Sequence, residues 1–243
     1  LLMKKLQGFT LMEMVIAMVI LAIIMVGIGS YIEAGVKGYS STVDRERLQS
    51  EARFLLARMT KEIRHAAPNS LSVSGISGSK CLSFYPIIGS AAYYDNLPNN
   101  SHSLNISTFD DAKKWNSSDK IAVGFIEPQQ YEKSDINFVA LSDGKDNLWS
   151  LTVSSPITTS SPANRLYLYK NKISYCLLNS TIVRMTDNKT PIVMAQNVSQ
   201  FKPGVEVAGL SSNAIALIGL QFKDPSSQEV ANYNHSVQVL NAL

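Results

Sequence analysis

The side chains that most often carry out chemistry in proteins are sparse and scattered in this chain. Its 243 residues include three histidines, His65, His102 and His235, and no pattern in the sequence brings them together. Two cysteines, Cys81 and Cys176, are too few for a four-thiolate zinc site. No nucleophile-elbow, zinc-protease, phosphate-loop or dinucleotide-binding pattern is present. We therefore expect no catalytic residue, no bound metal and no cofactor.

One acidic segment is a candidate for cation binding. Residues 142–147 read SDGKDN, which places Asp143 and Asp146 on either side of a glycine and a lysine. Calcium prefers carboxylate oxygens, but an EF-hand loop ends in a bidentate glutamate that this segment lacks. Asp-Gly pairs are typical of turns. We expect a plain turn here, and calcium binding stays an open alternative.

The two cysteines could form a bond instead of binding a metal. Cys81 and Cys176 both lie in segments whose alternating polarity predicts strands. In an oxidising compartment such a pair closes as a disulfide, and the alternative is two buried thiols. We favour the disulfide, although the sequence does not show whether the two strands are neighbours.

One carboxylate, Glu13, lies beside a strongly apolar run. Met14–Ile32 contains 19 residues without a charge, and as a helix it would be about 28 Å long, close to the hydrocarbon thickness of a bilayer. A carboxylate at membrane depth costs about 2–3 kcal/mol, so such a residue commonly has a partner or a function. The alternative is a glutamate that reaches the lipid headgroups from the helix end.

The flanks of this run predict its orientation. Lys4 and Lys5 precede it and should remain cytoplasmic, which would place the rest of the chain outside the inner membrane. A secretory signal would have a shorter apolar core followed by small residues at a cleavage site. Gly27 and Gly29 could mimic that site, so this alternative stays open.

Composition divides the chain near residue 67. All 9 prolines lie at Pro68 or later and all 17 asparagines at Asn69 or later, so the first 67 residues lack the main helix breaker. Residues 68–243 carry no net charge, and the whole chain carries only +3. A neutral domain without a basic stripe argues against nucleic acid as a partner.

The segment after the apolar run is predicted to be an amphipathic helix that ends at Pro68. Arg58 and Glu62 are spaced for an ion pair on its polar face. Gly35 and Gly38 should bend or locally melt the helix. Its apolar face, expected to pack on the downstream sheet, is formed by Leu48, Ala52, Leu55, Met59, Ile63 and Ala66.

Beyond residue 68 the apolar period changes from 3.6 to 2, so we expect an α+β protein with an antiparallel sheet. Asn171 and Asn179-Ser180 are predicted turns that join three successive strands into a meander. Ala91–Ser118 is rich in Asn, Ser and Asp, which predicts a long surface loop. The expected strands are residues 81–88, 120–126, 137–141, 148–153, 165–170, 172–178, 181–185, 214–222 and 236–240.

The sequence Gly8-Phe9-Thr10-Leu11-Met12-Glu13, followed by the long apolar run, resembles the signal of type IV prepilins. The resemblance implies that a prepilin peptidase cuts between Gly8 and Phe9 and methylates the new amino terminus of Phe9. It also implies that Glu13 neutralises the amino terminus of a neighbouring subunit during assembly. Met12 stands where Ile, Leu or Val is commoner in the family. Because Leu1 and Leu2 precede Met3, we expect translation to start at Met3.

Three further segments are similar to minor pilin-like biogenesis proteins of the mannose-sensitive haemagglutinin (MSHA) pilus. They are residues 64–70 (RHAAPNS), 81–87 (CLSFYPI) and 235–241 (HSVQVLN). The resemblance implies a minor pilin that initiates or caps a pilus, with major and minor pilins as partners. The alternatives are a J-type pseudopilin of type II secretion and a membrane-anchored adhesive domain.

The expected organisation follows from these interpretations. Residues 1–8 are a leader, 9–33 a transmembrane and assembly helix, and 34–67 an amphipathic helix. Residues 68–243 form a periplasmic, antiparallel β-rich domain. We expect a single-pass protein of the inner membrane that moves into the pilus on assembly and is not an enzyme.

Overall fold

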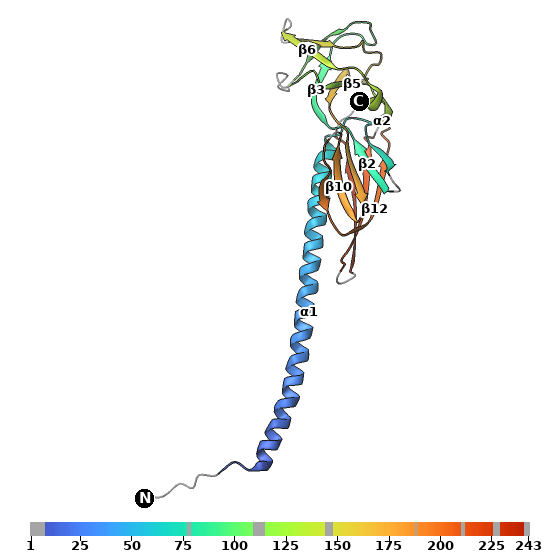
Figure 1. Ribbon diagram of the computed structural model, residues 1–243. Coiled ribbons are helices and arrows are strands. Elements are labelled where there is room, and N and C mark those ends of the chain that lie inside the picture. Colours follow the sequence, from blue (N-terminus) through green and yellow to red (C-terminus); the bar gives the residue numbers. More distant parts are fainter. Residues whose placement is uncertain are drawn as a thin grey trace, which may run out of the picture. The chain divides into compact units, whose positions relative to one another are not determined.

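A computed structural model describes residues 8–76, 79–108, 115–143, 148–187, 189–209, 212–225 and 229–240. The chain divides into two compact units, Leu1–Arg47 and Leu48–Leu243, and each is described by itself. Helix α1 (Leu11–Arg64) contributes to both units, and the second unit adds a short helix α2 (Pro128–Lys133) and all the strands (Figure 1).

In the first unit α1 is an unbroken helix, so the expected melting at Gly35 and Gly38 is wrong. A glycine costs only about 1 kcal/mol relative to alanine in a helix, and the surrounding turns offset that cost. Lys37 pairs with Glu33 at 2.6 Å, and the Thr42 hydroxyl donates to the Gly38 carbonyl at 2.9 Å. The glycines therefore weaken this segment without interrupting it.

In the second unit the predicted apolar face of α1 is confirmed. Arg58 and Glu62 also form the expected ion pair, at 2.7 Å. The helix ends at Arg64, ahead of Pro68. A proline sterically disfavours helical geometry in the residue before it, which here is Ala67. The Ala67 N–H instead donates a hydrogen bond to the Tyr85 carbonyl at 2.7 Å. The buried helix residues are Leu48, Ala52, Leu55, Met59 and Ile63, followed by Ala66.

Two antiparallel sheets share the hydrophobic core with this half of α1, which confirms the α+β class. We call the first the disulfide sheet, with order β1-β2-β9-β10-β11. Its strands are β1 (Ser72–Ile76), β2 (Ser79–Phe84), β9 (Ile173–Leu178), β10 (Thr181–Thr186) and β11 (Ile192–Ala195). We call the second the helix sheet, formed in order by β12 (Val198–Glu206), β13 (Ile215–Lys223) and β14 (Val230–Gln238).

A third antiparallel sheet, which we call the inserted sheet, has a core of its own. All of its strands come from the chain between β2 and β9, which are themselves hydrogen-bonded neighbours. It lies beyond the C-terminal end of α1 (Figure 1). In spatial order its strands are β5 (Lys120–Val123), β8 (Arg165–Tyr169), β3 (Ile87–Tyr93), β4 (Ser103–Ser107), β7 (Trp149–Val153) and β6 (Phe138–Asp143).

The predicted meander is only half correct. Asn179 and Ser180 both have positive φ (46° and 59°) and make the two-residue turn between β9 and β10. Asn171 does not make a hairpin, because β8 pairs with β3 and β5 and the chain leaves the inserted sheet before β9. Alternation of polarity predicted both strands, but alternation does not identify a strand's partner.

Several strand boundaries were wrong. The expected strand 81–88 is interrupted between β2 and β3, where Pro86 cannot donate a ladder hydrogen bond. The last strand begins at Val230, six residues before the expected Ser236. The sequence did not reveal this earlier start because the asparagines in the strand have low strand propensity. The sequence did not predict strand β12, which contains Pro203. The proline is tolerated there because β12 is an edge strand.

The expected surface loop Ala91–Ser118 was also wrong. It contains the end of β3, all of β4 and the buried Trp115. Strand β4 turns only Leu104 and Ile106 inward, and two apolar positions give too short an alternation to recognise.

Candidate functional site: the N-terminal helix and its supports

The first turn of α1 is organised by Thr10 and Glu13. Thr10 precedes the helix, and its Oγ1 accepts a hydrogen bond from Glu13 N–H at 3.2 Å. A threonine followed three residues later by a glutamate is the spacing of a capping box. A carboxylate in the first turn is also stabilised by the helix dipole. Thr10 therefore caps the helix through the backbone N–H of residue 13, and the Glu13 carboxylate is well placed for the helix dipole, an arrangement that sequence reasoning missed.

The apolar half of α1 is uncovered. Phe9 is 78% exposed, and the large apolar side chains from Leu11 to Ile32 are exposed as well. By length and composition, with a mean hydropathy of 2.8 in its most apolar window, α1 could cross a membrane. None of that window is buried inside the described part of the chain. Such a helix needs lipid or other apolar helices around it.

The second half of α1 is fixed to the disulfide sheet by a polar cluster around Glu62. Its carboxylate accepts hydrogen bonds from Arg184 Nε at 3.0 Å and Tyr175 Oη at 2.9 Å, in addition to its pair with Arg58. Burial, and then the charge of Glu62, raises the pKa of Tyr175 well above its ordinary value. The tyrosine therefore remains a hydrogen-bond donor at neutral pH.

Cys81 and Cys176 are directly opposite one another in β2 and β9 and are joined by a disulfide. Both are fully buried, and the structure contains no free cysteine. The bond thus joins the two strands between which the inserted sheet enters and leaves.

The histidines are distributed differently from the sequence expectation. His65 and His235 line one groove of the second unit, together with Leu240 from the segment after β14. His235 lies inside β14, where its Nε2 is 2.9 Å from Thr60 Oγ1. His102 is elsewhere, with Nδ1 3.3 Å from the Val153 carbonyl oxygen. Among the described residues no group of three or more His, Cys, Asp or Glu is placed to hold a metal ion.

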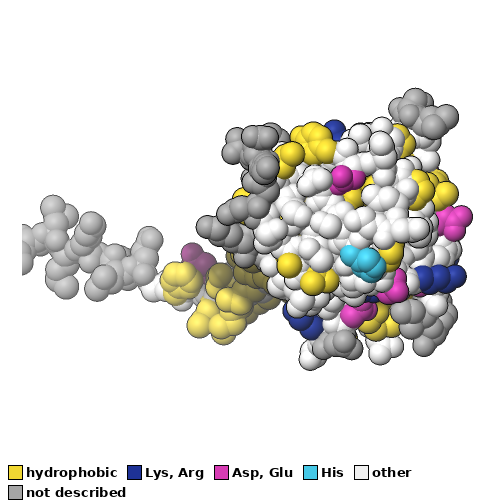
Figure 2. All heavy atoms as spheres, turned by 90° about the horizontal axis from the view of Figure 1, so that it is seen from above, with side chains coloured by type: hydrophobic (Ala, Val, Ile, Leu, Met, Phe, Trp, Pro, Cys, Tyr) yellow, Lys and Arg dark blue, Asp and Glu magenta, His cyan; other side chains and the backbone are white. Residues whose placement is uncertain are grey.

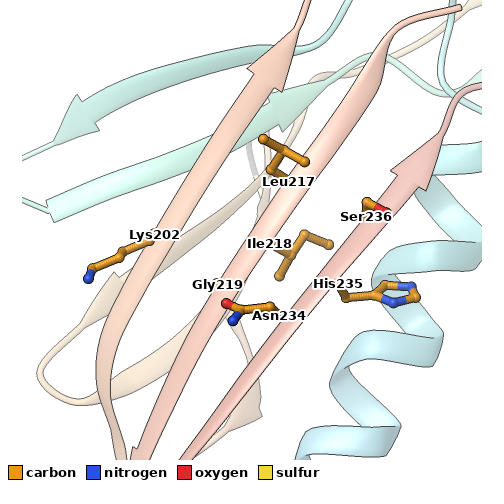
Figure 3. Close-up of a pocket in the computed structure, with 7 residues that line it drawn as sticks. All are labelled: Lys202, Leu217, Ile218, Gly219, Asn234, His235 and Ser236. Atoms are coloured by element: carbon orange, nitrogen blue, oxygen red, sulfur yellow. The ribbon is translucent and has the colours of Figure 1, made fainter.

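A shallow hollow marks the helix sheet at Gly219 (Figure 3). Lys202 on β12 and Asn234 on β14 are opposite Gly219 in register, and a Cβ at Gly219 would lie 3.2 Å from the Lys202 Cβ. In Figure 3 the His235 ring points toward α1. Ser236 and His235 both line the hollow, but successive residues of a strand point to opposite faces, and the His235 ring is engaged with Thr60. The acidic segment 142–147, expected to be a turn, is only partly described, because residues 144–147 lie outside the described residues.

The face formed by the inserted sheet is mostly uncharged (Figure 2). Its few basic and acidic side chains are scattered, and no basic stripe crosses the visible face (Figure 2). This distribution gives no electrostatic support to nucleic-acid binding.

Comparison with known proteins identifies the N-terminal segment. Residues 3–29 match the family described as the prokaryotic N-terminal methylation motif, a range that includes Gly8, Phe9 and Glu13. No curated protein and no solved structure matches the chain. The motif and the apolar helix behind it support a pilin or pseudopilin-type protein. Such a motif implies processing by a prepilin peptidase and assembly with other pilins, and it points to a structural role.

Proposed function

We propose that this chain is a minor pilin, which assembles through the first half of α1 into a type IV pilus of the MSHA type. The observation that carries the proposal is a methylation motif directly in front of a helix with an uncovered apolar half. The second half of the same helix is buried on the β sheets. A pilin subunit is first anchored in lipid and then packs against the helices of other subunits. It therefore needs an apolar helix half that its own domain leaves uncovered, and a second half that holds the helix to that domain.

Processing is proposed at the bond between Gly8 and Phe9, with methylation of Phe9. The cut removes residues 1–8 and leaves the apolar helix on the product. The chain is proposed to begin as a single-pass inner-membrane protein, with residues 9–33 as the span and residues 68–243 in the periplasm. It then enters the pilus, in an initiating or tip complex.

Mass spectrometry of the mature amino terminus tests this processing. Methylated Phe9 is expected, and Gly8→Val should leave the leader attached. Gly27→Val is the matched control, because it changes a glycine at the site of a hypothetical secretory cut and should leave processing intact. A terminus beyond Gly27 would contradict the proposal.

Glu13 is proposed to pair with the amino terminus of a neighbouring subunit. At low dielectric that pair compensates two charges that would each be costly alone. Glu13→Gln removes the charge and keeps a hydrogen-bonding side chain at the capping position, whereas Thr10→Ala removes the cap and keeps the charge. Glu13→Gln should eliminate the chain from sheared pili while Thr10→Ala retains it.

The opposite result would assign Glu13 to helix capping alone. Absence of the wild-type chain from sheared pili, together with normal piliation of cells that carry Glu13→Gln, would favour a membrane-anchored adhesive domain that never enters a fibre. A J-type pseudopilin of type II secretion is the remaining alternative. It predicts that deleting the chain stops protein export and leaves pili unchanged.

A further inference from the structure

A polar pocket of about 490 Å³ lies where the inserted sheet meets the disulfide sheet. Its lining comes from segments far apart in sequence. Tyr85 lies between β2 and β3, Ser118 precedes β5, and Glu132 belongs to α2. Asn171 lies in the crossover from β8 to β9, and Asp187 follows β10. Small-ligand sites are concave, and convergent polar groups in them fix the orientation of the ligand.

The charges of this pocket are compensated within the protein. Lys172 Nζ pairs with Glu132, and its backbone N–H donates to Asp187 Oδ2 at 3.0 Å. Lys170 Nζ lies 3.2 Å from the fully buried carboxylate of Asp119. Lys120, the third lysine of the lining, donates from Nζ to the Ser134 carbonyl at 2.8 Å. The three lysines are balanced by Glu132, Asp187 and Asp119, so a free anion would meet carboxylates and a free cation would meet ammonium groups. The pocket therefore suits a ligand that is polar and uncharged.

Tyr85 supplies a fixed hydroxyl in this lining. Its ring is stacked on Tyr131 and in edge contact with Tyr169, both with centroids 5.4 Å away. Its backbone N–H donates to Ser70 Oγ at 3.3 Å, and its carbonyl accepts from Ala67. Among the described residues its phenolic oxygen has no hydrogen-bond partner. Burial, reinforced by the charges of Glu132 and Asp187, raises the pKa of Tyr85, so this hydroxyl remains protonated at neutral pH.

We propose that this pocket binds a saccharide. Sugar hydroxyls both donate and accept hydrogen bonds, which matches a lining that contains carboxylates, hydroxyls, ammonium groups and an amide. The Tyr85 hydroxyl, which no described residue satisfies, would bond to one of these sugar hydroxyls. The site is independent of processing and fibre assembly, so its test does not depend on the proposed function.

Direct binding is the first test. The full chain is purified in lauryldimethylamine oxide, a detergent without a sugar headgroup, and examined by saturation-transfer-difference NMR. The probes are D-glucose, D-galactose, D-mannose and N-acetyl-D-glucosamine at millimolar concentration, with inorganic phosphate as competitor. At least one saccharide should give a saturable signal that phosphate does not displace. No signal from any of the four, or displacement by phosphate, would overturn the proposal.

Two variants place the binding in this pocket. Tyr85→Phe removes one oxygen and no described protein contact, and Asp187→Asn keeps an acceptor for Lys172 N–H. Each should weaken binding about 3–10-fold, the loss expected for one hydrogen bond. Tyr94→Phe is the matched control, because Tyr94 is 62% exposed and outside the lining. Unchanged affinity in both pocket variants, or equal loss in Tyr94→Phe, would refute the assignment.

Discussion

The two halves of α1 have opposite surroundings. Before Arg47 the helix exposes apolar side chains from Leu11 to Ile32, and from Leu48 onward its apolar stripe is buried against two sheets. The first half can gain stability from burial only through lipid or other chains, whereas the second half gains it from its own domain. One helix thus links an exposed apolar segment to a folded domain. Changes that affect the two halves unequally test this difference.

Raising the pH should have the largest effect, and it should act on the second unit. Burial raises the pKa of Tyr169 to about 12, and it also raises the pKa values of Tyr85, Tyr131 and Tyr175 above their ordinary value of 10. Below pH 10 both the folded and the unfolded states keep these protons. Above pH 10 the unfolded state loses them first, so stability falls by at most about 1.4 kcal/mol per tyrosine per pH unit.

Urea unfolding of the full chain in micelles, followed by near-ultraviolet circular dichroism between pH 8 and 12, measures this loss. Tyr169→Phe should flatten the decline between pH 10 and 12. A midpoint that is constant across this range would contradict the burial of the tyrosines.

Truncating the buried stripe of α1 should come next. Leu55 is fully buried, so Leu55→Ala should lower the free energy of unfolding of the second unit by about 2–5 kcal/mol through lost contacts and a cavity. Ile20→Ala, in the exposed half, is the matched control and should leave that free energy unchanged. Equal effects of the two variants would mean that the halves do not differ as described.

Removing the disulfide should cost about 2–4 kcal/mol in the second unit. The double variant Cys81→Ala/Cys176→Ala tests this, because the bond joins residues separated by 95 positions. Reductant should destabilise the wild type and have no effect on the double variant. Non-reducing peptide mapping should recover the two cysteines in one linked fragment, and free thiols in exported protein would exclude the bond.

Breaking the cluster around Glu62 should cost about 1–3 kcal/mol. Glu62→Gln leaves the half-buried Arg184 and the fully buried Tyr175 without their charged acceptor. Thermal unfolding of the full chain measures the loss. Recovery of stability in a Glu62→Gln/Arg184→Met double variant would show that the uncompensated arginine causes it.

The smallest effect is expected for the exposed pair in the first unit. Glu33 Oε1 and Lys37 Nζ lie 2.6 Å apart, but both side chains are largely exposed. Glu33→Gln should therefore change helix content by an amount equivalent to at most about 0.5 kcal/mol. A loss as large as that of Glu62→Gln would show that α1 depends on surface charge in its first half.

Local patterns predicted much of this molecule. The spacing from Leu48 to Ala66 predicted the buried stripe, and Asn179-Ser180 predicted a turn because both residues tolerate positive φ. Pairing across long sequence distances was beyond such patterns. Nothing local to Arg165–Tyr169 indicates that this strand pairs with β3 and not β9. For the same reason the sequence did not predict that His65 and His235 line one groove, or that a pocket forms around Tyr85.

The disulfide between β2 and β9 has a mechanical consequence. Covalently, the inserted sheet is attached to the rest of the second unit only through the chain that leaves β2 and the chain that enters β9. A pull on that sheet reaches both strands, and Cys81 and Cys176 bond them across the ladder. Tension would first load the ladder pairs from Phe84–Ile173 to Leu82–Tyr175, and separation of the two strands would stop at the covalent crosslink. Strands β2 and β9 would therefore stay joined even after the part of the ladder next to the inserted sheet has opened.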